Sequence, residues 1–131
     1  RGGGRSSGRE TAARVIGGAV ARAMLEALGV SVKAFTSGIG SIEISDSYDI
    51  DTRFDNPLVM PDMEAYEKAS VYLSELMSKG NSCGGTARCL VYGLPAGIGQ
   101  PVFNKLSAEI SKAIMSIGAV KAIEFGACFK S

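Results

Sequence analysis

The opening stretch of this chain, RGGGRSSGRETAARV, constrains its fold more than any other. Three consecutive glycines at residues 2–4 let the backbone take positive φ and approach a ligand closely. Ser7 and Glu10 stand three residues apart, directly before an apolar run, which is the capping-box pattern. The pattern predicts a helix start at this point, with the Ser7 hydroxyl accepting from the Glu10 amide and the Glu10 carboxylate reaching back.

Basic residues surround the predicted turn, and Glu10 is the one acid that offsets them. They are Arg1, Arg5, Arg9 and Arg14. Amides at a helix N-terminus flanked by guanidinium groups suit a phosphate or carboxylate ligand. Because no Gly-Lys-Ser/Thr follows the glycines and no strand precedes them, neither a Walker loop nor a dinucleotide fingerprint is indicated. Two interpretations stay open, an anion-binding turn and a flexible lead-in to an ordinary capped helix.

Composition excludes several classes of function. At 131 residues with 46% hydrophobic content, residues 1–131 are predicted to form a single domain. The net charge of +1 gives no general attraction to nucleic acid or membrane. We find no apolar run long enough for a spanning helix and no signal peptide. An RNA-binding role for the glycine-arginine start is disfavoured, because residues 1–34 contain no aromatic residue for base stacking.

Cysteine and histidine content limits the chemistry further. The absence of histidine excludes a Ser-His-Asp or Cys-His arrangement within this chain. With no CxxC pair either, no metal site is predicted. Cys83 and Cys89 would lie too far apart along a strand for a disulfide. Together with Cys128 they are interpreted as small buried apolar residues in a reducing compartment.

Periodicity predicts three helices and four strands in the order α-β-β-α-β-α-β. The predicted helices span 8–28, 62–79 and 102–116, and the predicted strands span 30–35, 42–44, 86–93 and 120–125. Turns are expected at 37–40 and 93–101, and a solvated acidic loop at 45–61. This order predicts an α/β (α+β) fold, a layered sandwich of helices on a mixed or mainly antiparallel sheet.

The first predicted helix contains two adjacent glycines, Gly17 and Gly18. Since each costs about 1 kcal/mol relative to alanine inside a helix, we expect another backbone to pack closely there. A face of small residues suits contact with a sheet or a partner helix. A structural or subunit-interface role is therefore a second hypothesis beside ligand binding.

Four motifs together resemble the chorismate synthase family. They are RGGGRSSGRETAARV at the start, GNSCGG at 80–85, GLPAGIGQPVFNKL at 93–106 and AIMSIGAVKAIEFG at 113–126. They occur in the family's order and spacing and cover nearly the whole chain. The resemblance implies a central fragment of a larger chorismate synthase chain.

The resemblance also implies a reaction and its cofactor. Chorismate synthase is a lyase of the shikimate pathway of aromatic amino acid biosynthesis. It converts 5-enolpyruvylshikimate 3-phosphate to chorismate by anti 1,4-elimination of phosphate. The family uses reduced FMN, with NADPH as a candidate electron source, and is cytoplasmic in bacteria and commonly homotetrameric. Clustered arginines suit such a site, since they supply charge and forked donors to anions.

Residue by residue, the resemblance assigns roles to the opening motif. Arg5, Ser6 and Ser7 match positions that contact FMN. Gly8, where the family usually has alanine, and Arg9 match substrate-binding positions. The family's two active-site histidines lie in motifs before residue 1, so no catalytic residue is assigned here. We expect the isolated fragment to be inactive and to bind FMN weakly or not at all, and the alternative is a non-catalytic structural or oligomerisation core piece.

Overall fold

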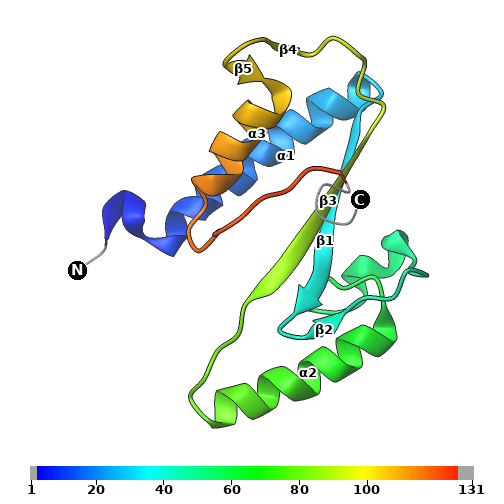
Figure 1. Cartoon of the computed structure of the whole chain (residues 1–131), viewed down its shortest axis with the longest axis vertical. Coiled ribbons are helices and arrows are strands. Elements are labelled where there is room, and N and C mark those ends of the chain that lie inside the picture. The colour runs from blue at the N-terminus through cyan, green and yellow to red at the C-terminus, as the bar shows by residue number, and fades with distance from the viewer. Residues whose placement is uncertain (1–2, 127–131) are drawn as a thin grey trace. The chain divides into compact units, whose positions relative to one another are not determined.

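The computed structural model describes residues 3–126, and contacts divide the chain into two compact units (Figure 1). One unit consists of residues 1–29 and 93–131, and the other of Val30–Tyr92. The prediction of a single domain over 1–131 stays a prediction. Arg1 and Cys128 lie outside the described residues.

The Val30–Tyr92 unit is built on an antiparallel sheet. Strand β1 (Ser31–Ile39) lies between β2 (Ile42–Glu43) and β3 (Gly85–Tyr92), in the order β2-β1-β3. Val32 pairs with Val91, and the register shifts between Thr36 and Gly38. The turn into β2 uses Gly40, at φ 59°, a conformation that glycine takes without steric cost.

Helix α2 (Met63–Ser78) contributes two buried alanines to the small core of this unit. Met60, Ala65 and Ala69 are buried, and five partly buried apolar residues pack against them. These are Ile39, Ile42, Ile44, Leu58 and Tyr66. Residue Asp62 caps the helix, because one carboxylate oxygen accepts from the Ala65 amide at 3.1 Å and the other from the Ser45 amide at 2.9 Å. This cap fixes the helix start and the loop after β2 together.

A second side chain shapes the loop before α2. The buried Asn56 amide donates to the Met60 carbonyl at 2.7 Å, and its oxygen accepts from the Met60 amide at 3.2 Å. Between them Val59 sits at φ 54° and its carbonyl accepts from the Thr36 amide at 3.0 Å. The short helical turn η3 (Ile50–Phe54) lies earlier in this loop.

The other unit is mainly helical. Two 3-10 turns, η1 (Gly4–Ser6) and η2 (Gly8–Glu10), lead into α1 (Thr11–Ala27). A two-stranded hairpin of β4 (Gly99–Gln100) and β5 (Asn104–Lys105) precedes α3 (Leu106–Met115). As predicted, Gly29 follows α1 with positive φ, at 77°.

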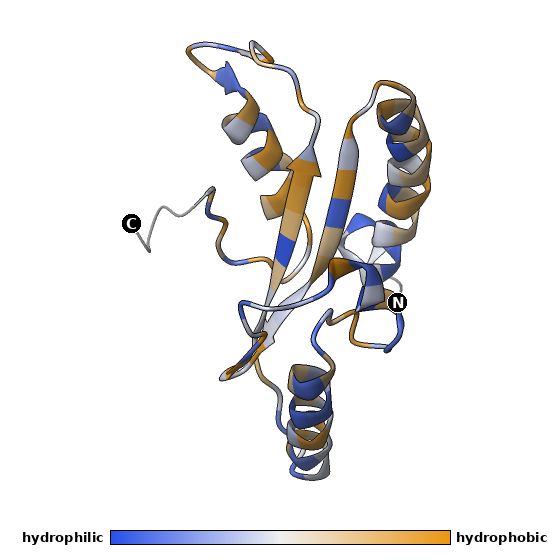
Figure 2. Cartoon of the chain, turned by 90° about the vertical axis from the view of Figure 1, so that its right-hand side faces the viewer, coloured by the Kyte–Doolittle hydropathy of each residue, from blue (hydrophilic) through white to orange (hydrophobic). Residues whose placement is uncertain are grey.

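Helix α1 contains many apolar residues, coloured orange in Figure 2. Its large apolar side chains are exposed to solvent. No residue of α1, all of which are described, is buried. Val15, Ile16 and Met24 are 66–70% exposed. At Gly17 and Gly18 no atom among residues 3–126 would lie within 4 Å of an added Cβ. The predicted close approach of another backbone is therefore not made within the described part of the chain.

The α/β (α+β) class with an antiparallel sheet is confirmed, but the last predicted element is wrong. Residues 120–125 are described and form no strand. An apolar-rich segment alone does not make a strand, because the amides and carbonyls of a strand need a neighbouring strand to bond. No strand of the described residues pairs with this segment.

Two predicted boundaries also differ. Strand β1 continues to Ile39, so the predicted turn at 37–40 falls at its end. Helix α3 begins at Leu106 rather than at Val102, because Gln100 and Asn104 pair across the β4–β5 hairpin. Phe103, which falls within the predicted helix 102–116, lies in that hairpin and is 87% exposed.

Candidate functional site

The predicted ligand residues lie in the two consecutive turns before α1. Gly3 and Gly4 take φ of 64° and 51°, in the left-handed region that glycine favours. The Ser6 and Ser7 amides then donate to the Gly3 and Gly4 carbonyls at 2.8 and 3.1 Å. Two 3-10 turns thus replace the single helix start that the sequence predicts.

The predicted capping box is wrong. Ser7 is extended, at φ −79° and ψ 141°, and its side chain makes no capping hydrogen bond among the described residues. The Glu10 amide donates to the Ser7 carbonyl instead, at 3.0 Å. The Glu10 carboxylate pairs with the Arg14 Nε at 3.0 Å. An ionised donor one helical turn away gives a stronger hydrogen bond than a backbone amide, which explains why the carboxylate does not reach back.

The five predicted site residues form one contiguous segment. Arg5, Ser6, Gly8 and Arg9 are exposed and Ser7 is half-buried. An added Cβ at Gly4 or Gly8 would meet no atom of residues 3–126 within 4 Å. The backbone is therefore open to close approach by a ligand, beside guanidinium and hydroxyl donors. This donor set fits the anionic part of FMN and a phosphorylated acid.

Arg14, one of the basic residues of the opening stretch, has a structural partner. Its guanidinium donates to the Ser116 hydroxyl at 2.8 Å and to the Ser116 carbonyl at 3.4 Å. Ser116 is the C-cap of α3. Arg14 therefore links the start of α1 to the end of α3, and the periodicity of α1 gave no signal for this long-range contact.

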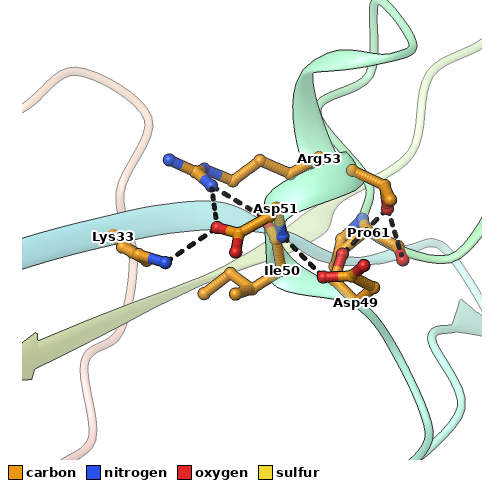
Figure 3. Close-up of polar contacts among 7 residues, drawn as sticks. Lys33, Asp49, Ile50, Asp51, Arg53 and Pro61 are labelled. Carbon is orange, nitrogen blue, oxygen red and sulfur yellow. Dashed lines mark hydrogen bonds and ion pairs between the residues drawn. The ribbon is translucent and has the colours of Figure 1, made fainter.

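A second charged cluster lies in the Val30–Tyr92 unit, where the sequence predicts a solvated acidic loop (Figure 3). Asp51 pairs with Lys33 at 2.8 Å and with Arg53 at 3.7 Å. The hydrogen bond and the charge of Lys33 lower the pKa of the Asp51 carboxyl. Arg53 also donates to the Ile50 carbonyl at 2.7 Å and stacks over Phe54 at 4.3 Å. The Lys33–Asp51 pair links β1 to η3, and the charges of Lys33, Asp51 and Arg53 are paired with one another. We therefore interpret the cluster as structural.

The cysteines that the structure describes are free thiols. Cys83 is half-buried, but Cys89 is exposed, so the interpretation of buried cysteines is wrong for Cys89. The reason is that every residue of β3 except Leu90 is exposed. Desolvation raises the pKa of the Cys89 thiol, which keeps it protonated at neutral pH. Within residues 3–126, no three His, Cys, Asp or Glu side chains gather as a metal site.

Comparisons with known proteins agree with the fold and show the family. The family model described as chorismate synthase matches residues 1–131. Chorismate synthase from Agathobacter rectalis is 50% identical over 127 residues, covering 96% of this chain and 35% of the relative. The enzyme from Lachnoclostridium phytofermentans is 50% identical over 131 residues, covering 99% and 36%. A crystal structure of chorismate synthase superposes with a TM-score of 0.86 at 31% identity, covering 95% of this chain and 42% of that one.

The chain has an α/β fold with an exposed arginine-serine turn suited to anions. It belongs to the chorismate synthase family. It spans about a third of the length of the curated relatives that it matches. None of the helices among residues 3–126 has the length and apolarity to cross a bilayer.

Proposed function

We propose that this chain forms one wall of the flavin and substrate site of a chorismate synthase. The whole enzyme would eliminate phosphate from 5-enolpyruvylshikimate 3-phosphate to give chorismate. The observation that carries the proposal is the match of the family model to the entire chain, together with the exposed arginine-serine segment that the chain holds before α1. This same segment holds the residues that match FMN-binding and substrate-binding positions in the family resemblance.

Each residue has a specific part in the proposed site. Arg5, Ser6 and Ser7 would contact FMN, since their guanidinium and hydroxyl groups donate to anionic and polar oxygens. The Arg9 guanidinium would bind the anionic substrate and stabilise charge as phosphate leaves. Gly8 would contribute its backbone, which is open to approach. No catalytic acid or base is proposed within residues 1–131, which contain no histidine.

When bound, reduced FMN would provide electron density for the departure of phosphate and would recover it, without net redox change. NADPH is a proposed source of electrons for the flavin. The whole enzyme is proposed to be cytoplasmic and homotetrameric. These properties are inferred from the family resemblance. They are proposed for a whole enzyme, of which this chain spans about a third by comparison with its relatives.

Segment exchange tests the proposal directly. Residues 1–131 would replace the matching segment of the A. rectalis enzyme, and chorismate formation would be measured with reduced FMN. The exchanged enzyme is expected to be active, because half of the aligned residues are identical. In this enzyme Arg9→Ala is expected to raise KM or lower kcat at least about 10-fold through loss of a charge-assisted hydrogen bond.

Lys121→Ala is the matched control, because it removes an exposed cation outside the proposed site, and its kinetics should equal those of the exchanged enzyme. A folded but inactive exchanged enzyme, or unchanged kinetics for Arg9→Ala, would contradict the proposal.

The alternative, a structural or oligomerisation piece without a ligand site, is favoured by the exposed apolar side chains of α1. The two functions differ in one respect. A purely structural segment predicts that Arg5→Ala and Arg9→Ala leave the FMN and substrate affinities of the exchanged enzyme unchanged, whereas the site proposal predicts a loss in both.

A further inference from the structure

The Arg14 side chain is bonded on two sides. Its Nε pairs with the Glu10 carboxylate at 3.0 Å, and its two terminal nitrogens reach the hydroxyl and the carbonyl of Ser116 at 2.8 and 3.4 Å. The Ser116 hydroxyl in turn donates to the Ala113 carbonyl at 2.6 Å. One guanidinium therefore joins the last residue of η2 to the C-terminal turn of α3.

The Glu10 carboxylate is the acid nearest in sequence to the proposed anion-binding residues. It follows Arg9 directly, and it is the one negative charge among the first fifteen residues. An unpaired carboxylate at this point would compete with a phosphate for the arginines and would repel it. Its pairing with Arg14, one turn further into α1, holds the carboxylate toward the helix and offsets its charge.

The other side of the contact favours an arginine as well. Ser116 caps α3, and carbonyl groups at a helix C-terminus carry partial negative charge that attracts a cation. The planar guanidinium can meet a carboxylate on one edge and a hydroxyl and a carbonyl on another. A lysine ammonium is a compact charge on a flexible stem and lacks this fixed geometry.

We propose that Arg14 is a positioning residue for the anion-binding turn. It anchors η2, which carries Gly8 and Arg9, against the end of α3, and it keeps the Glu10 charge from opposing the bound phosphate. The inference rests on the proposed function, since it assigns a role toward the same substrate. Arg14 itself does not touch the ligand.

A double-mutant series in the segment-exchanged enzyme tests this role. Arg14→Ala is expected to raise KM for 5-enolpyruvylshikimate 3-phosphate at least about 10-fold, with a smaller change in kcat. Adding Glu10→Gln should return KM to within about 3-fold of the starting enzyme, because the released charge is removed. Thermal stability should stay reduced in both variants, since the bridge to Ser116 is lost in both. Arg14→Lys keeps a positive charge beside Glu10 but loses the bridge to Ser116. Its KM should therefore rise less than that of Arg14→Ala.

A merely structural Arg14 gives a different pattern. The Arg14→Ala variant would then lower the melting temperature and kcat, and Glu10→Gln would not restore KM. That result, or an unchanged KM in Arg14→Ala, would overturn the inference. If Arg14→Ala fails to fold, Glu10→Gln alone decides the matter, because the inference expects an equal or lower KM and a higher KM would overturn it.

Arg9→Ala separates this inference from the proposed function. An Arg9→Ala variant with unchanged KM and unchanged kcat contradicts the substrate role of the whole segment. A raised KM in Arg9→Ala, with no rescue of Arg14→Ala by Glu10→Gln, contradicts only the role of Arg14.

Discussion

At the scale of single residues, the opening segment shows how a neighbouring charge overrides a local sequence signal. The spacing of Ser7 and Glu10 is that of a capping box, but Glu10 pairs with Arg14 and Ser7 remains extended. At Asp62, by contrast, the carboxylate caps α2 through the Ala65 amide. The residue four positions after Asp62 is Tyr66, which is not a cation. The Asp62 carboxylate therefore forms the bond expected of an N-cap acid.

Gly8 and Gly4 should respond oppositely to alanine. Gly8 does not have positive φ and has open space around it, so Gly8→Ala should stabilise the chain by about 0.5–1 kcal/mol through lower entropy of the unfolded state. Gly4, at φ 51°, should lose about 1–2 kcal/mol, because a side chain is strained in the left-handed region. Denaturant unfolding of both variants measures the difference. Equal effects at the two positions would contradict the described conformation of η1.

The Asp62 cap predicts a pH dependence of stability. Hydrogen bonds from the Ser45 and Ala65 amides lower the pKa of Asp62. A lowered pKa in the folded state means that the stabilisation is fully present above the unfolded pKa of about 3.9 and is lost as pH falls through the folded value.

Asp62→Ala should therefore cost about 1 kcal/mol at neutral pH, and the cost should shrink below pH 4. The control variant Asp62→Asn keeps an acceptor oxygen without the titration, so its stability relative to the parent should vary less steeply above pH 4 than in the acid range. Melting temperatures of the three proteins across pH 2–7 provide the measurement. A constant difference between Asp62→Ala and the parent over that range is the contrary outcome.

At the scale of elements, α1 forms from local signals, but the described residues bury none of its side chains. Its end at Ala27, followed by Gly29, agrees with the predicted end at residue 28, whereas its start at Thr11 is three residues later than predicted. The segment 120–125 shows the converse. The sequence predicts a strand there, but a strand requires a partner, and no strand of the described residues supplies one.

Alanine substitutions at Gly17 and Gly18 should have opposite effects on the stability of the isolated chain and of the segment-exchanged enzyme. No atom among residues 3–126 would lie within 4 Å of an added Cβ at either position, so alanine at each should stabilise the isolated chain by about 1 kcal/mol from helix propensity. In the segment-exchanged enzyme the same substitutions should destabilise it, if another backbone packs there as the sequence predicts. Melting temperatures of both proteins provide the comparison. Stabilisation in both would show that the glycines serve no close packing.

At the scale of the whole molecule, the chain carries the predicted arginine-serine segment but spans about a third of its relatives. We expect the isolated chain to bind FMN weakly or not at all and to show no turnover, because it contains no histidine and covers about a third of the length of its relatives. Flavin-fluorescence titration and a chorismate assay measure both properties. Sub-micromolar FMN binding by the isolated chain would overturn this expectation.

The sequence alone determined the family, the α/β class, the bounds of α2 within about two residues, and the segment that holds the proposed site residues. These depend on local patterns, on helix-ending glycines and on motifs that lie in the chain itself. Only the tertiary structure decided that Glu10 pairs with Arg14, that Arg14 reaches Ser116 and that residues 120–125 form no strand. The physical reason is that an ion pair or a strand depends on which groups the fold brings within bonding distance, and spacing along the chain does not specify that.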